Sequence, residues 1–244
     1  MSTDDDNARK SGFSWQRIVP LLVLAAGLIA FFAFGLDDYL TFETLRENRA
    51  WLLQHVAESA LLAALVYMGI YILVVAFSLP GGAVMTITGG FLFGQWLGTA
   101  YVLVAATIGA TILFIAAKTA LGDLLRAKAG PFLKKMEAGF QEDALSYLLV
   151  LRLIPIFPFF IVNLVPAFLG VTLRVFAIAT FIGIIPGSFV FATVGAGLGS
   201  IFDSGEEFSS GSILTPEIVT ALIGLAVLAM LPVAYKKFRA KRGH

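Results

Sequence analysis

An arginine stands inside an otherwise apolar run at residues 151–170, which read LRLIPIFPFFIVNLVPAFLG. The guanidinium of Arg152 is a permanent cation whose planar fork of N–H donors fits a phosphate group. Asn163, in the same run, carries an amide that could bond a headgroup or hold a turn. Charged side chains within membrane segments usually mark substrate pathways, so these residue types favour an anion-binding site. The alternative for Arg152 is an interfacial side chain that extends to the cytoplasmic surface.

Prolines interrupt the same run at Pro155 and Pro158. Each proline removes a backbone donor and clashes with the preceding turn, and lipid cannot satisfy the carbonyls that are freed. The sequence therefore predicts a broken, re-entrant segment packed against protein. Helix N-termini created at Pro80 and at Pro155 to Pro158 would add dipole attraction for an anion.

Residues 80–94, PGGAVMTITGGFLFG, form another interrupted segment, which is the first of the two along the chain. We assign a first hairpin to it, with six marker residues: Pro80, Gly81, Gly82, Gly89, Gly90 and Gly94. Its glycines, like Gly170 after the second segment, would allow close backbone approach. Packing alone is the simpler reading of these glycines. Lys118 and Arg174 are secondary candidates that are more typical of helix-end anchors.

The composition is that of an integral membrane protein. Of 244 residues, 59% are hydrophobic and 14% are charged, and the mean hydropathy is +0.90, whereas soluble domains carry about 25% charge. The chain has no cysteine and two histidines, which excludes disulfides and disfavours a metal centre. The sequence contains no P-loop and no nucleophile with a histidine partner, so we expect no enzyme activity, no cofactor, no metal and no nucleic-acid partner.

Four apolar blocks organise the chain, at 18–36, 59–117, 144–202 and 218–235. A span needs roughly 20 residues, so each long block holds more than two spans' worth of chain. Both long blocks read as an interrupted hairpin followed by an apolar helix. Paired interrupted segments are typical of repeat-built transporters. The predicted fold is an all-α polytopic membrane protein with two inverted repeats, each a re-entrant hairpin plus a transmembrane helix, flanked by N- and C-terminal transmembrane helices.

Basic residues predict the orientation. They gather in the N-terminal segment, in 118–143 and in the C-terminal tail, whereas 203–217 has none and 37–58 is mostly acidic. The positive-inside rule then places both termini and the 118–143 segment in the cytoplasm. The expected division is an N-terminal tail (1–17), a first transmembrane helix (18–36), an external loop (37–58), a core domain (59–202), an external loop (203–217), a last transmembrane helix (218–235) and a basic tail (236–244). Within the core we expect a hairpin (59–98), a helix (99–117), a cytoplasmic amphipathic loop (118–143), a hairpin (144–170) and a helix (172–198) kinked by Pro186.

These motifs resemble the DedA superfamily, in its VTT-domain branch (the SNARE-associated Golgi protein family). The resemblance rests on PGG…GGFLFG at 80–94 and on an R-x-x-P-x-x-P…N…G pattern at Arg152, Pro155, Pro158, Asn163 and Gly170. It covers about residues 60–200. It implies a polytopic membrane protein with opposed re-entrant hairpins, and relatives are linked to moving phospholipids or lipid-phosphate carriers between leaflets.

Two features of the better-studied family members are missing here. Residues 59–117 contain no acid, and no second arginine closely follows Arg152. A proton relay needs a titratable group inside the membrane, so both departures disfavour proton coupling.

The predicted function is a lipid transporter of the scramblase or flippase kind in a bacterial-type inner membrane. Its partners would be membrane lipids with phosphate headgroups, which would pair transiently with Arg152. The alternatives are an ion- or proton-coupled carrier of small solutes, and a non-transporting scaffold that packs through small-residue faces such as those of Gly183 and Gly195. A homo-oligomer is one assembly that such faces would allow.

Overall fold

The structure is a computed structural model, and it describes residues 15–127, 131–153 and 159–204, together with Ile223, Gly224, Val227 and Met230. Every regular element within these ranges is a helix. The helical fold class predicted from the sequence is therefore confirmed for this part of the chain. The segments 205–217 and 236–244, most of 218–235, and the candidate residues Pro155 and Pro158 lie outside the described residues.

Four elements form the N-terminal region. They are α1 (Trp15–Ala33), the short 3-10 helix η1 (Leu36–Tyr39), α2 (Phe42–Glu47) and α3 (Arg49–Glu58). The first apolar helix ends at Ala33, because Gly35 adopts a left-handed backbone with φ 62°. The segment 37–58, expected as an external loop, is thus built of short helices.

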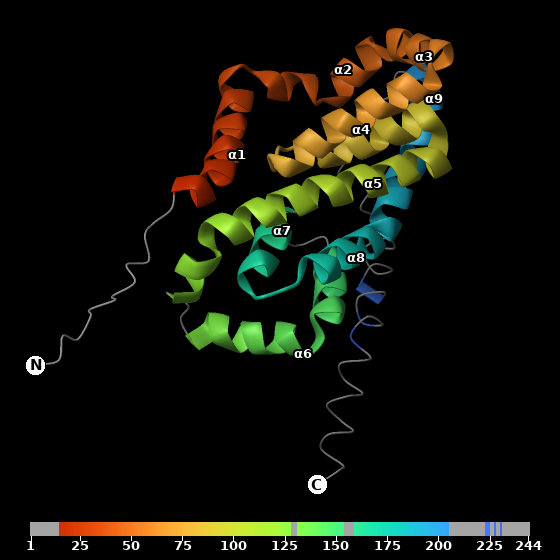
Figure 1. Cartoon of the computed structure of the whole chain (residues 1–244). Helices are drawn as coiled ribbons and strands as arrows, with labels where there is room; N and C mark the ends of the chain where they lie inside the picture. The colour runs from red at the N-terminus through yellow and green to blue at the C-terminus, as the bar shows by residue number, and fades with distance from the viewer. Residues whose placement is uncertain are drawn as a thin grey trace, which may run out of the picture.

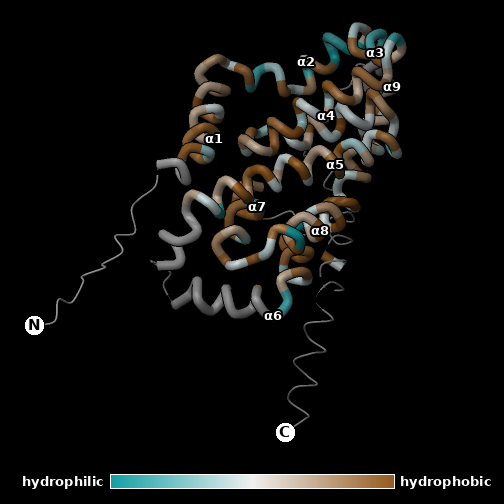
Figure 2. The backbone as a smooth tube through the Cα atoms, viewed as in Figure 1, coloured by the Kyte–Doolittle hydropathy of each residue, from teal (hydrophilic) through white to brown (hydrophobic). Residues whose placement is uncertain are grey.

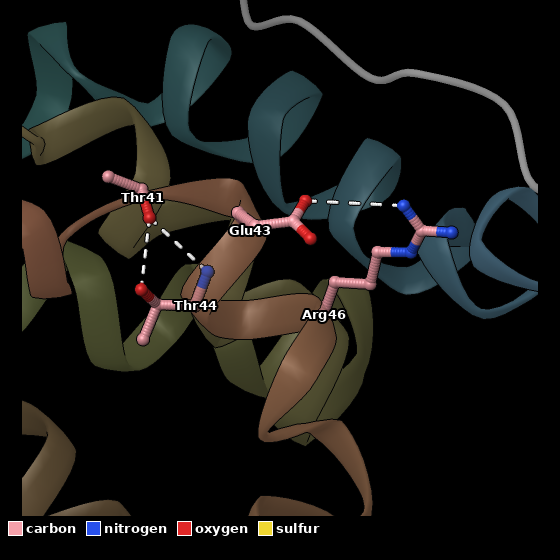
Figure 3. A network of polar contacts seen from close by, with 4 residues as sticks. All are labelled: Thr41, Glu43, Thr44 and Arg46. Atoms are coloured by element: carbon pink, nitrogen blue, oxygen red, sulfur yellow. Dashed lines mark hydrogen bonds and ion pairs between the residues drawn. The ribbon is translucent and has the colours of Figure 1, made fainter.

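A threonine starts α2. The Thr41 hydroxyl accepts a hydrogen bond from the Thr44 backbone N–H at 3.2 Å, which satisfies one of the unpaired donors of the first turn. Glu43 and Arg46 face each other at 4.0 Å one turn apart (Figure 3). Phe42, on α2, and Leu52, on α3, pack against a buried cluster of Leu45, Ile87 and Leu198. The N-terminal region therefore packs against the helices that contain Ile87 and Leu198.

An antiparallel helix pair follows. It consists of α4 (Ala60–Ala76) and the first part of α5 (Gly82–Ala127). The Tyr67 hydroxyl donates to the Met85 carbonyl at 2.8 Å, and Tyr71 contacts Thr86 at 2.9 Å. Because residue numbers rise on one helix as they fall on the other, the two helices run in opposite directions.

Gly94 divides α5 into two helices, 82–93 and 95–127. Its backbone has φ 76° and ψ 170°, a conformation available almost only to glycine. The chain reverses there, since a Cβ on Gly98 would lie 2.6 Å from the Gly89 carbonyl oxygen. The second part runs beyond the expected helix 99–117 and continues through Lys118 to Ala127, so the first ten residues of the expected loop 118–143 are helical.

The next helix, α6 (Pro131–Leu153), also contains a break. Asp143 has φ −154° and ψ 62°, and its carboxylate accepts from the Ser146 N–H at 3.4 Å. An aspartate at this position caps the helix that follows. Most of 131–143 is therefore helical, and a separate helix begins after Asp143, close to the predicted start of the second hairpin. That helix is followed by α7 (Phe159–Phe168).

Two further helices, α8 (Leu173–Gly183) and α9 (Ile185–Ser204), occupy the region expected as one helix at 172–198. They are bent by 40° at the break between them. The bend immediately precedes Pro186, which lacks the N–H needed to continue the helix hydrogen bonds. The predicted kink is confirmed, and it is sharp enough to divide the segment into two helices.

The core lies where α5 is covered by α4, α7, α8 and α9 (Figure 1). The rings of Phe114 and Phe176 stack there with centroids 4.3 Å apart and planes 22° apart. Figure 2 shows many hydrophobic residues along α4 and α5, and large apolar side chains of both helices are exposed. They include Leu61, Leu62, Leu65, Val66, Ile70, Leu73, Val104, Ile108, Ile112 and Ile115. Surfaces of this kind are costly in water and suit contact with lipid tails.

By length and composition, one described apolar stretch, Gly82–Ala120, could cross a membrane. Because the chain reverses at Gly94, the part that would do so is the helix after that residue. A second span is available if the bent pair Leu173–Gly183 and Ile185–Leu198 crosses as one unit. The other described apolar helices are shorter, at Val19–Ala33, Ala60–Ala76 and Phe159–Phe168.

Candidate functional site

Three chain breaks surround a cavity of about 400 Å³. The turn between α4 and α5 contributes Pro80, Gly81 and Gly82. The end of α6 contributes Arg152, and the bend between α8 and α9 contributes Gly183, Ile184, Gly187 and Ser188. The size falls within the range of about 300–1,000 Å³ that is common for ligand sites. The cavity thus brings together the arginine of the second interrupted segment and the glycine turn of the first.

Arg152 is held by α8. Its Nη2 donates to the Thr180 hydroxyl at 2.8 Å, and its guanidinium carbon lies 5.4 Å from the centroid of the Phe176 ring. The Nε atom is buried and has no hydrogen-bond partner. Among the described residues no carboxylate pairs with this guanidinium. A hydroxyl and an aromatic face therefore support the cation, and its N–H donors are not consumed by an acid.

Gly183 gives the arginine its room. A Cβ at this position would lie 2.7 Å from the Cβ of Arg152 and 3.1 Å from its Cγ. A real side chain would force one of the two backbones to move. The close approach of α6 to α8 at this point depends on the missing side chain, which places the guanidinium at the bend.

The first hairpin supplies a polar wall to the same cavity. Tyr71 and Thr86 both line it and are 5% and 6% exposed. The Thr86 hydroxyl donates to the Gly82 carbonyl at 2.8 Å and lies 2.9 Å from the Tyr71 hydroxyl. The cavity therefore has a cation on one wall and a group of oxygen atoms on another.

The other glycines of the first hairpin serve packing. A Cβ on Gly90 would collide with the Ala192 carbonyl of α9, and a Cβ on Gly195 would collide with the Ile87 carbonyl. A Cβ on Gly89 would strike the Tyr67 hydroxyl. These positions let α5 and α9 cross backbone to backbone. Gly94 makes the reversal in α5, and none of Gly89, Gly90 and Gly94 lines the cavity.

Asn163 lies in α7, away from the cavity lining. It is 0% exposed, and neither atom of its amide has a hydrogen-bond partner. Buried amides without partners are unfavourable, so the burial of Asn163 in α7 costs free energy of folding. The sequence-based pairing of Asn163 with Arg152 in one site is not seen among the described residues.

The remaining candidates hold the chain between α7 and α8. Gly170 has φ 75°, which suits a glycine. The Lys118 ammonium donates to the Val171 carbonyl at 2.8 Å and lies 5.4 Å from the Phe114 ring centroid. Arg174 is exposed in the first turn of α8. These residues do not line the cavity.

Sequence reasoning missed the partners of Arg152 and the polar residues that line the same cavity. Thr180 and Phe176 are ordinary residues of an apolar helix, and only tertiary packing brings them to Arg152. The signal for Tyr71 and Thr86 was weak but present, because they are polar residues in a 59-residue block, 59–117, that has no acid. Gly183 could be predicted as a packing residue from its spacing to Gly187, without indicating what it packs against.

Comparison with known proteins supports the resemblance drawn from the motifs. The family model described as the VTT domain matches residues 79–197, a range that includes all three chain breaks at the cavity. A protein of Dictyostelium discoideum described as Transmembrane protein 41 homolog is 32% identical over 171 residues, covering 69% of this chain and 49% of that protein. Transmembrane protein 41B of Homo sapiens is 30% identical over 175 residues, covering 70% of this chain and 58% of that protein.

The relative from Gallus gallus, also described as Transmembrane protein 41B, is 28% identical over 175 residues and is covered over 62% of its length. The chain thus spans about half to three fifths of the curated relatives it matches. No solved structure matches the chain.

Proposed function

We propose that this chain, a VTT-domain membrane protein of the DedA family, moves phospholipids or lipid-phosphate carriers between the leaflets of its membrane. Arg152 is the group that receives the phosphate. The headgroup enters the cavity, pairs transiently with the guanidinium, and leaves on the other side while the acyl tails stay in lipid. The chain's partners are then membrane lipids, and the protein acts without enzyme chemistry or a cofactor.

The observation that carries this proposal is the guanidinium on the cavity wall, which no carboxylate among the described residues neutralises. Thr180 and Phe176 support the cation without neutralising it, and Nε has no partner. An anion that enters gains charge-assisted hydrogen bonds. The positive charge thereby becomes part of the binding energy for phosphate, which a hydrophobic cavity would otherwise exclude.

The proposal includes the architecture of two opposed re-entrant hairpins in inverted repeats. Helix 82–93 has twelve residues and α7 has ten, so at 1.5 Å per residue they reach roughly 18 Å and 15 Å. Neither length spans a hydrocarbon core of about 30 Å. In this arrangement 37–58 and 203–217 are external, both termini are cytoplasmic, 218–235 is the last span, and the membrane is a bacterial inner membrane.

The direct test is leaflet exchange of fluorescent phospholipids in liposomes that contain the purified protein. Wild type should exchange the labelled lipid, and Arg152→Ala should exchange it at least tenfold more slowly, because a hydrogen-bonded ion pair contributes about 1.5–3 kcal/mol. Arg174→Ala is the matched control. It removes an exposed arginine that does not line the cavity, so its exchange rate should equal that of wild type.

Each alternative gives a different result in the same assay. Exchange that persists in a well-folded Arg152→Ala protein would keep lipid transport and discard the arginine site. A rate that follows an imposed pH gradient would favour an ion-coupled carrier. Absence of exchange for every lipid, including lipid-phosphate carriers, would contradict the proposal and favour a scaffold.

A further inference from the structure

The cavity carries a second feature that the proposed function does not use, an oxygen-lined part of its wall formed by the first hairpin. This wall consists of the hydroxyls of Tyr71 and Thr86 and the carbonyl of Gly82. The three residues come from both sides of the first hairpin turn, and all three line the cavity. Tyr71 is 2.9 Å from Thr86 but 3.5 Å from the Gly82 carbonyl oxygen.

These distances determine where the hydroxyl protons lie. Thr86 donates its proton to the Gly82 carbonyl at 2.8 Å. Since a hydroxyl has one proton to donate, the short contact to Tyr71 is satisfied when Tyr71 donates to Thr86. Both protons are then used within the wall. The Tyr71 oxygen keeps acceptor lone pairs, so the wall accepts hydrogen bonds and does not offer them.

The charge of the cavity is also defined by its lining. Arg152 is the one charged side chain among the described lining residues. A ligand with a single negative charge would bring the occupied cavity to neutrality. The phosphate of a zwitterion would pair with the arginine, but its ammonium would leave the occupied cavity with a net positive charge and would find no carboxylate among these residues. A dianionic monoester would add an excess negative charge in a medium of low dielectric constant.

From these features we infer the class of headgroup: a mono-anionic phosphodiester whose second substituent carries hydroxyl groups. The phosphate binds Arg152, and a headgroup hydroxyl donates to the Tyr71 oxygen of the same cavity. Tyr71 is the specificity-determining residue, and Thr86 positions it by accepting its proton. This inference rests on the proposed function, because it assigns the substrate of the same cavity.

The test compares three lipids with identical acyl chains in the liposome exchange assay. Phosphatidylglycerol has the inferred headgroup, phosphatidylethanolamine is zwitterionic, and phosphatidic acid is a monoester. Wild type should exchange phosphatidylglycerol about fivefold faster than either of the others, the factor expected for one neutral hydrogen bond. Equal rates for the three lipids would overturn the inference and leave the proposed function standing.

The variant Tyr71→Phe tests the residue assignment. It removes the acceptor oxygen and keeps the ring, so phosphatidylglycerol exchange should slow about fivefold while phosphatidylethanolamine exchange is unchanged. Tyr67→Phe is the matched control, because it also removes a buried hydroxyl from α4, one that donates to the Met85 carbonyl and does not line the cavity. Its lipid preference should be that of wild type.

The remaining outcomes separate the two levels of the argument. A uniform slowing of all lipids in Tyr71→Phe would contradict a role in specificity. If wild type prefers phosphatidylglycerol but Tyr71→Phe keeps the preference, the assignment to this wall is wrong. If wild type exchanges no lipid at all, the proposed function fails and this inference fails with it.

Discussion

Arg152 depends on a neighbour that has no side chain. Gly183 lets the β- and γ-carbons of the arginine pass within contact distance of α8, and the guanidinium then reaches Thr180, nearly one turn earlier on the same helix. The position of the charge is therefore set by packing on its aliphatic stem as much as by the bond at its tip.

The first prediction follows from this contact. Gly183→Ala should slow lipid exchange severalfold and destabilise the protein by about 1–3 kcal/mol, because the added methyl displaces the arginine stem. Gly69→Ala is the control, since Gly69 lies in α4 with no atom within 4 Å of the added Cβ, and it should match wild type or be slightly more stable. Thermal unfolding and leaflet exchange measure the two effects, and unaltered exchange in Gly183→Ala would contradict the argument.

Asn163 provides a second prediction at the residue scale. Its amide is fully buried in α7 with no hydrogen-bond partner among the described residues. Asn163→Leu, which keeps the branching of the side chain but replaces the amide with two larger methyl groups, should stabilise the protein by about 1–3 kcal/mol. A rise of several degrees in the unfolding temperature would bear this out. A fall would mean that the amide makes bonds in the membrane that outweigh its burial.

The sequence singles out Arg152 as the candidate binding residue but does not predict its surroundings. A lone arginine in an apolar run can be predicted as a candidate because charge at membrane depth is costly. Thr180 and Phe176 carry no such signal, since threonine and phenylalanine are common in membrane helices. Asn163 shares a run with Arg152 but lies on a different helix and does not line the cavity, which nearness in the sequence could not reveal.

At the scale of elements, the crossing of α5 and α9 joins the two halves of the chain. Backbone meets backbone at Gly90 with Ala192 and at Gly195 with Ile87. Crossings of this kind rely on small residues, because dispersion and weak polar contacts act only at short range. The crossing also fixes the distance between the first hairpin and the bend that lines the cavity.

Gly90→Leu should therefore separate α5 from α9 and prevent the protein from reaching its folded state. We expect loss of the monodisperse peak in detergent and a destabilisation above 3 kcal/mol. Gly69→Leu adds the same side chain to an exposed position of α4 and should leave the peak intact. A normal profile for Gly90→Leu would show that the crossing tolerates separation.

Helix breaks were more predictable than helix ends. Gly94 and Pro186 mark their breaks through backbone chemistry that reads directly from the residue type. The end of α5 was less predictable, because charge at Lys118 marks where the membrane ends and not where helix hydrogen bonds stop. Lys118 remains helical and uses its ammonium to bind the Val171 carbonyl.

At the scale of the whole molecule, the charge pattern predicts the orientation in the membrane, and the chain is well suited to testing it. It contains no cysteine, so any single cysteine added is the only site for a thiol reagent. Asp38→Cys should react with a membrane-impermeant maleimide on intact cells. Asp123→Cys and Lys241→Cys should react only after permeabilisation, because the positive-inside rule predicts that the basic segments face the cytoplasm.

Labelling of Lys241→Cys from outside would place the C-terminal tail on the external side. That result would contradict the inverted arrangement of the hairpins. The charge rule alone supports the orientation of the tail. The described helices support the alternation of short and long segments, since 82–93 is followed by 95–127 after the reversal at Gly94.

The 40° bend between α8 and α9 forms part of the cavity lining, through Gly183, Ile184, Gly187 and Ser188. The width of the cavity therefore depends on the angle between α8 and α9. Straightening the joint would move α8, which contains Thr180, relative to α9, which contains Ser188. The width of the cavity would change with this movement. In the proposed transport, a small molecule bound at this joint would stop lipid exchange without competing for the arginine.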